Sequence, residues 1–325
     1  MHTVETVRGA VPAEALGRVL AHEHVFVADP EARANLGRDW WDEDAAVAKA
    51  VAGLTDLAEA GFGAIMDPTV FGLGRDVRLL ARVQEQVPLT IVAATGLYIK
   101  AHLPRYLSTQ AYGAWHRGDR LAELFIRDLE HGIGDSGIRA AFLKCVVDAA
   151  GYTPDQERVH HAVLRAHEAT GAPLMVHTDG PSRSAGLLLD EWTQRGVDFT
   201  RVIVSHASEC EDLDLLIRLL DHGAILGFDK FGLDVFLASE TRIRNLLALL
   251  ERGHAAQIVL SQDYGCFADT FADDAGTVHI AAEAPDWGYR YVDRILLPAL
   301  REAGVSESDI DAMLVEAPRR FLTGS

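Results

Sequence analysis

Eight short apolar runs, each followed by a longer segment, constrain the fold of this 325-residue chain more than any other feature. Val and Ile are frequent in the runs, as they are in buried strands. Several of the longer segments have helical periodicity and stop at or near a glycine, as helices commonly do; they are 44–60, 156–170, 213–221 and 240–252. We predict strands at 18–25, 64–68, 89–95, 140–146, 173–178, 201–205, 224–228 and 257–262.

Strand and helix alternate eight times, which predicts a parallel sheet closed into a (β/α)₈ TIM barrel of the α/β class. A doubly wound open sheet usually carries a glycine-rich phosphate turn after its first strand, and residues 18–25 are followed by none. No repeat or linker divides the chain, so we expect a single domain over 1–325. Residues 1–17 form a cap segment, and 264–288 form a long loop or lid before helices at 289–303 and 307–321.

Composition excludes several classes of function. The formal net charge of −18 argues against nucleic acid and anionic membranes as partners. The three cysteines show no paired spacing and fit a reducing compartment. No signal peptide is evident, and no apolar stretch approaches the roughly 18 residues of a membrane span. We therefore expect a cytoplasmic protein that acts on a small molecule.

Polar residues stand where the predicted strands end, which is where barrels of this kind place their active sites. His22 and His24 alternate along the first strand and should therefore point the same way. The other strand ends carry Tyr98, Lys144, His177, His206, Lys230 and Asp263. Histidines in helical segments, by contrast, are expected at the surface; they are His160, His161, His167, His222 and His254.

Each candidate ligand also has an ordinary explanation. His177 and His206 could be hydrogen-bonded core histidines, and Asp263 could cap the segment that follows it. Taken together, imidazoles on strands one, five and six with a carboxylate on strand eight form a ligand set suited to zinc or a similar divalent ion.

Lys144 lies in an apolar strand, where an ammonium group is costly unless it is paired or neutralised. One explanation is an ion pair with Asp148 or another acid. The other is a neutral amine that has reacted with CO₂ to give N6-carboxylysine, an anionic ligand able to bridge two cations. The sequence leaves both open.

The order His22-Glu23-His24, Lys144, His177, His206 and Asp263 resembles the phosphotriesterase family of the amidohydrolase superfamily. The resemblance runs over nearly the whole chain. It includes Gly96-Leu97-Tyr98, the stretch from Gly227 to Asp234, and Pro318-Arg319-Arg320-Phe321. Within the family the chain is most similar to the phosphotriesterase-like lactonases, which carry a tyrosine where Tyr98 stands.

This resemblance implies a hydrolase with two divalent ions per chain, zinc first, with cobalt, manganese or iron as alternatives. His22, His24 and Asp263 would hold the buried ion, and His177 and His206 the exposed one. Carboxylated Lys144 and a hydroxide would bridge them. The hydroxide would attack a lactone or phosphotriester, Tyr98 would lie beside the polarised oxygen, and Asp263 would carry the proton.

The family resemblance also implies a homodimer that opens acyl-homoserine or other γ- and δ-lactones, with promiscuous organophosphate triesterase activity. A dedicated phosphotriesterase (aryldialkylphosphatase), or another ester or amide hydrolase, is the alternative. Three residues depart from the family pattern: Lys230 replaces an arginine, Gln262 replaces a histidine, and Ala317 replaces an asparagine. We expect substrate contacts from the lid and from Tyr98, Phe228, Lys230, Tyr264 and Cys266.

Overall fold

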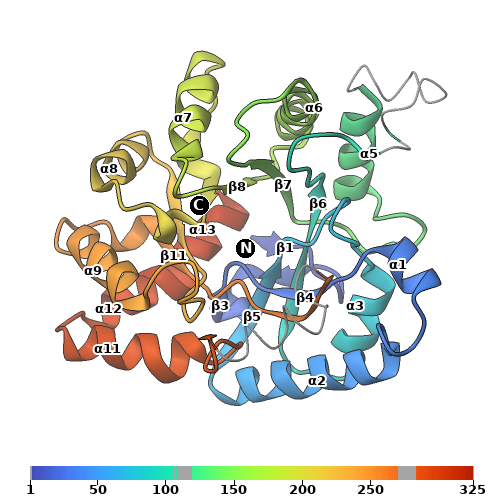
Figure 1. Cartoon of the computed structure of the whole chain (residues 1–325), viewed down its shortest axis with the longest axis horizontal. Helices are drawn as coiled ribbons and strands as arrows, with labels where there is room; N and C mark the ends of the chain where they lie inside the picture. The colour runs from blue at the N-terminus through green and yellow to red at the C-terminus, as the bar shows by residue number, and fades with distance from the viewer. Residues whose placement is uncertain (1, 105–106, 108–118, 270–282, 325) are drawn as a thin grey trace.

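The computed structural model describes residues 2–104, 107, 119–269 and 283–324. Eight parallel strands form one sheet in the order β11-β10-β9-β8-β7-β6-β5-β3. The backbone amide of Ala21 donates to the carbonyl oxygen of Leu260 at 3.2 Å, which joins the two end strands. The helices surround this ring (Figure 1). The predicted (β/α)₈ barrel is confirmed.

Seven of the eight predicted strands overlap single observed strands, within a few residues at each end. These are β5 (Phe62–Asp67), β6 (Thr90–Gly96), β7 (Phe142–Val147), β8 (Leu174–Thr178), β9 (Val202–Ser205), β10 (Ile225–Phe228) and β11 (Ile258–Leu260). The helices between them include α2 (Glu43–Glu59), α3 (Val77–Gln84), α5 (Asp119–Glu130), α6 (Pro154–Thr170), α7 (Ser184–Gln194), α8 (Leu213–Asp221) and α9 (Ser239–Leu250).

The prediction of one strand over 18–25 is wrong. The chain forms β3 (Arg18–Leu20), turns at residues 21–23, and continues as β4 (His24–Val27). β4 pairs in parallel with β12 (Gly265–Ala268), outside the barrel sheet. At this turn the backbone amide of His22 donates to Oγ of Ser261 at 2.8 Å, so it does not bond to a neighbouring strand.

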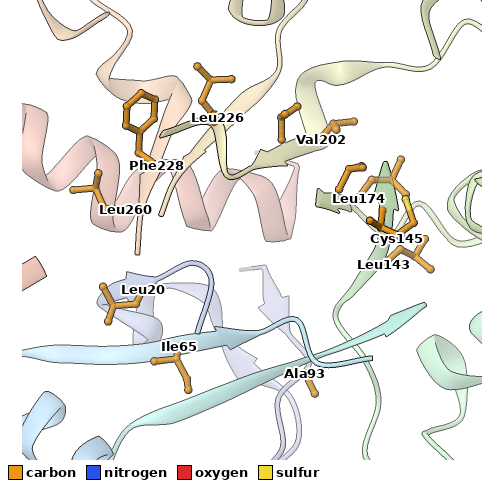
Figure 2. Packing of buried hydrophobic residues seen from close by; sticks show 14 of the residues in the cluster. Leu20, Ile65, Ala93, Leu143, Cys145, Leu174, Val202, Leu226, Phe228 and Leu260 are labelled. Carbon is orange, nitrogen blue, oxygen red and sulfur yellow. The ribbon is translucent and has the colours of Figure 1, made fainter. Parts of the chain in front are cut away.

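Apolar side chains on alternate strand positions form two buried clusters. One includes Leu20, Ile65 and Leu226 and packs under the helices (Figure 2). The other takes the alternate positions, including Phe142 and Met175. Because side chains alternate along a strand, this second set fills the barrel interior. Along each strand, every second residue therefore points into the barrel, up to the carboxyl-terminal end of the strand.

The amino-terminal segment closes the other end of the interior. The short hairpin of β1 (Thr3–Val4) and β2 (Val11–Pro12) leads into a 3₁₀ turn at Ala13–Leu16. Apolar side chains of this segment belong to the interior cluster, together with Phe321 of α13 (Ala317–Thr323).

The region after β11 is only partly described. Residues 265–268 form β12 rather than a loop, and residues 270–282 of the predicted lid lie outside the described residues. Beyond them, a π-helical turn at Val292–Leu296 leads into α11 (Leu297–Glu302), and α12 (Glu307–Asp311) leads through another π turn into α13. Among the helices that the structure describes, none is both long and apolar enough to cross a membrane.

His160 contradicts the expectation that helical histidines lie at the surface. It is buried on α6, with Nε2 2.9 Å from the Val146 carbonyl oxygen. Its Nδ1 accepts a hydrogen bond from Trp192 Nε1 at 3.1 Å. Both ring nitrogens are satisfied inside the protein by a neutral imidazole protonated on Nε2. His160 shares the buried face of α6 with Gln156 and Leu164, each four residues away.

We expect His160 to make the protein less stable in mild acid. Burial lowers its pKa from 6.5 to about 4, so between these values the unfolded chain binds a proton that the folded chain does not. The free energy of unfolding should therefore fall as the pH drops, with His160 contributing about 2 kcal/mol of the loss between pH 7 and pH 5. In urea unfolding, the free energy of unfolding of His160→Gln should fall less between pH 7 and pH 5 than that of the wild type, by this amount. The exposed neighbour variant His161→Gln should behave as wild type, and an unchanged loss in His160→Gln would contradict this prediction.

Candidate metal centre

The structure brings all six predicted metal ligands together at the carboxyl-terminal end of the barrel. Lys144 and His177 lie two residues after Phe142 and Met175, whose side chains fill the interior, so they point inward at the mouth. The remaining ligands follow the ends of β3, β9 and β11 or begin β4; they are His22, His206, Asp263 and His24.

Asp263 joins the two histidines of the first strand region. Its Oδ1 lies 3.5 Å from Nε2 of His22 and 3.4 Å from Nε2 of His24. One ligand atom from each of these residues lies within 4.8 Å of the other two. Two imidazoles and one carboxylate are ligands that zinc and similar ions accept, so this group fits one metal position.

His177 and His206 form a second pair beside the first group. Nδ1 of His177 lies 2.7 Å from Nε2 of His206. Oδ2 of Asp263 lies 3.9 Å from Nδ1 of His206, and the rings of His22 and His206 have centroids 4.9 Å apart. The two groups are therefore contiguous.

The protonation of these groups suits metal binding. Burial lowers the pKa of His22, and it lowers the pKa values of His177 and His206 well below the ordinary value. Burial acts to raise the pKa of Asp263, but its interactions with the neighbouring imidazoles of His22 and His24 outweigh burial and hold this pKa below the usual range. Neutral imidazoles and an ionised carboxylate are the forms that bind metal.

Lys144 is 1% exposed and faces the imidazoles. Its Nζ lies 3.5 Å from Nε2 of His22, whereas Asp148, the acid considered as an ordinary partner, lines the pocket above the site. Burial lowers the pKa of Lys144 to about 8. About a tenth of this group is then the neutral amine at pH 7, the form that can react with CO₂.

Asp229 is a site residue that the sequence analysis did not single out. Its Oδ1 lies 2.7 Å from Nδ1 of His206, and its Oδ2 accepts from the backbone amide of His206 and lies 3.4 Å from Nδ1 of His22. A carboxylate on the far nitrogen fixes the tautomer and orientation of a ligating imidazole. The sequence pattern could have predicted this position, because interior side chains recur at every second residue of β10 and Asp229 lies two residues after Gly227.

Hydroxyl and carboxylate groups hold the first-strand histidines as well. Nδ1 of His24 lies 2.6 Å from Oγ1 of Thr69. Glu23 accepts hydrogen bonds from Ser261, Gln262 and Tyr264. Burial acts to raise the pKa of Glu23, while these three hydrogen bonds act to lower this pKa and favour the carboxylate form. Motif spacing alone predicts none of these contacts.

Strained backbone is concentrated at the site. Four non-glycine residues in the described ranges have positive φ, and three of them are His206 (63°), Lys230 (58°) and Asp263 (54°). Such conformations persist only where the surroundings enforce them, and they cluster at functional positions. Asp229 provides one such constraint, because it accepts from the backbone amide of His206 at 3.0 Å.

A pocket of about 840 Å³ opens above this cluster, within the size range of small-molecule sites. Tyr98, His177 and Lys230 line it, and the Tyr98 and His177 rings have centroids 5.2 Å apart. Nζ of Lys230 lies 2.8 Å from Oε2 of Glu209, and this ion pair raises the Lys230 pKa although burial opposes it. The wall is rich in carboxylates: Asp148, Asp179, Glu209, Glu211, Asp212 and Asp214.

Three predicted substrate contacts do not line this pocket. Phe228 is fully buried in the cluster beneath the helices, on the outward face of β10 (Figure 2). The prediction for Phe228 fails because it occupies the position that alternates with the interior residues Ile225 and Gly227. Tyr264 packs its ring against Trp287 and Tyr289, and the buried Cys266 lies 3.5 Å from the Tyr289 hydroxyl.

Gln262, the second departure from the lactonases, also faces away from the imidazoles. Its Nε2 donates to the Tyr289 carbonyl oxygen at 3.0 Å, and its Oε1 accepts from the Val292 amide at 3.1 Å. It therefore ties the end of β11 to the carboxyl-terminal helices and leaves the ligand cluster intact.

Comparisons with known proteins agree with this geometry. Residues 2–322 match the Phosphotriesterase family. A phosphotriesterase homology protein of Mycobacterium tuberculosis is 39% identical over 99% of this chain and 98% of its own length. An aryldialkylphosphatase of Saccharolobus solfataricus is 30% identical over 97% of this chain and 98% of its own. The solved structure of the phosphotriesterase from Mycobacterium tuberculosis has a TM-score of 0.91 and 36% identity, covering 99% of this chain and 98% of that one. Since barrel, ligand order and full-length similarity coincide, this chain belongs to the phosphotriesterase family of hydrolases.

Proposed function

We propose that this protein is a binuclear metal-dependent hydrolase that opens lactones and hydrolyses phosphotriesters more weakly. The observation that carries the proposal is the contiguous cluster of four imidazoles, one carboxylate and one buried lysine at the mouth of the barrel. In it, His22, His24 and Asp263 would hold the deeper ion, and His177 and His206 the ion facing the pocket. N6-carboxylated Lys144 would lie between them.

Two divalent ions in this position would lower the pKa of a shared water enough to supply hydroxide near neutral pH. The protein residues have separate tasks. Burial raises the pKa of Tyr98, so its phenol stays protonated and can donate a hydrogen bond to a carbonyl or phosphoryl oxygen beside His177. Asp263, ionised and in contact with His22 and His24, would accept a proton and pass it to the leaving oxygen.

A dedicated phosphotriesterase is the second candidate. It is favoured by the aryldialkylphosphatase relative, which matches nearly the full length of both chains.

The lining of the pocket indicates the polarity of the substrate. Its wall carries several charged side chains as well as apolar ones such as Leu213 and Phe236. A substrate with a compact polar ring fits such a wall better than one that is apolar throughout.

Metal content and hydrolysis should be measured on the same sample. Elemental analysis is expected to find about two divalent ions per chain, and kcat/KM is expected to be higher for γ- or δ-lactones than for a diethyl aryl phosphate. Two ions with a higher kcat/KM for the phosphotriester would favour the second candidate. Protein that holds no metal after reconstitution with zinc and bicarbonate would overturn both.

A further inference from the structure

We propose that Glu23 is a positioning residue that holds Asp263 in place through the backbone amides on either side of it. This inference rests on the proposed function, in which Asp263 binds metal and carries a proton. Glu23 lies between His22 and His24 in the chain, but its side chain contacts the segment 261–264 instead of the metal position. It is fully buried and contacts the backbone on both sides of Asp263.

Three donors converge on the two carboxylate oxygens of Glu23. Oε1 accepts from Oγ of Ser261 at 2.5 Å and from the backbone amide of Gln262 at 2.8 Å. Oε2 accepts from the backbone amide of Tyr264 at 3.0 Å. The amides immediately before and after Asp263 are therefore bound by one side chain.

Asp263 needs such support because its backbone is in the left-handed region, with φ of 54°. β11 ends at Leu260, so the sheet ladder does not extend to this residue. The amide of Asp263 itself donates to the His22 carbonyl oxygen at 3.2 Å. Together with the contacts of Glu23, this bond ties the strained segment to the turn that carries the two histidines.

The three donors suit a carboxylate. Both backbone amides can only donate, and Ser261 Oγ donates its hydroxyl hydrogen to Glu23 while it accepts from the His22 amide at 2.8 Å. A carboxylate has two acceptor oxygens and satisfies all three donors. A glutamine of the same shape has one acceptor oxygen, and its amide group would face a donor on the other side. Glu23→Gln therefore removes part of the clamp at nearly constant volume.

Loss of the Glu23 contacts should change the position of Asp263, the proposed metal ligand. Released from Glu23, the segment 261–264 can leave its strained conformation, and Asp263 then loses the contacts of 3.4–3.5 Å to the two imidazoles. Groups that orient a ligand are typically worth about 10–100-fold in metal affinity or activity. We expect an effect of this size from Glu23 although it does not contact the metal position.

The test compares Glu23→Gln with Asp128→Asn, which alters another fully buried carboxylate, one that accepts from Arg75 and Thr95 in the barrel wall. The first readout is the rate at which a chelator removes zinc from the reconstituted enzyme. The second is amide hydrogen exchange at Gln262, Asp263 and Tyr264 in metal-free protein. For Glu23→Gln, zinc loss and exchange at these amides should both accelerate by about tenfold or more. Asp128→Asn should change neither.

The outcomes separate this inference from the proposed function. Wild-type rates in Glu23→Gln, with two metals still bound, would overturn the role of Glu23 and leave the hydrolase proposal intact. Wild-type protein that binds no metal would remove the proposed function, while hydrogen exchange in the metal-free protein would still decide whether Glu23 holds the segment. If Glu23→Gln does not fold, Ser261→Ala removes one of the three donors, and it should show a smaller acceleration of the same two rates.

Discussion

Lys144→Met is expected to release the bound metal and lower kcat/KM for the preferred substrate by roughly three orders of magnitude or more. Methionine fills most of the space of the lysine side chain, one atom shorter, but has no amine to form a carbamate. The site would then have four imidazoles and one carboxylate but no anionic group between its two halves. Elemental analysis and steady-state kinetics on the same preparation measure both effects.

Two further measurements make the Lys144 prediction specific. Lys100 lines the same pocket but is exposed, so Lys100→Met should keep the wild-type metal content. Protein reconstituted with ¹³C-labelled bicarbonate should show one carbamate carbon signal by NMR that Lys144→Met lacks. Full activity and metal content in Lys144→Met would contradict the bridging role and leave Lys144 as an ordinary buried lysine.

Asp263→Asn is expected to lower kcat by about 10²–10⁴-fold, the usual contribution of a positioned acid or base. Asparagine keeps an oxygen near His22 and His24 but cannot accept and return a proton. Because the pKa of Asp263 is held below its usual range, the carboxylate is present throughout the neutral range. The measurement is kcat and KM from pH 5 to pH 9, with metal content determined alongside.

Asp148→Asn is the matched control for Asp263→Asn, because Asp148 lies on the wall of the same pocket. We expect it to change KM rather than kcat. A variant Asp263→Asn that retains both its metals and its wild-type kcat would exclude the proton-carrying role.

The strand and helix pattern could be predicted from the sequence because it depends on local periodicity. The helix at Leu213–Asp221 was predicted to the residue, and seven strands were placed within a few residues. The first strand was not placed correctly, because its break at residues 21–23 depends on the contact between Ser261 and Glu23. These two residues are about 240 positions apart in the chain. No local pattern reports such a contact.

The six ligand candidates could also be predicted, since parallel strands bring their carboxyl ends to one rim. The alternation of side chains along β10 distinguishes Phe228 from Asp229. Phe228, a predicted substrate contact, lies in the outer core, whereas Asp229, which no prediction included, supports His206. Applying the two-residue period from Ile225 through Gly227 would have distinguished them from the sequence alone.

The sequence by itself therefore determined the barrel, the order of the candidate ligand residues and the strand end on which each stands, because these follow from periodicity and residue type. Only the tertiary structure decided which groups support these candidate ligands. Thr69 at His24, Asp229 at His206 and Glu23 around Asp263 reach their partners through contacts between distant segments. Their distances and burial are set by how the eight strands close on one another, which no stretch of sequence specifies alone.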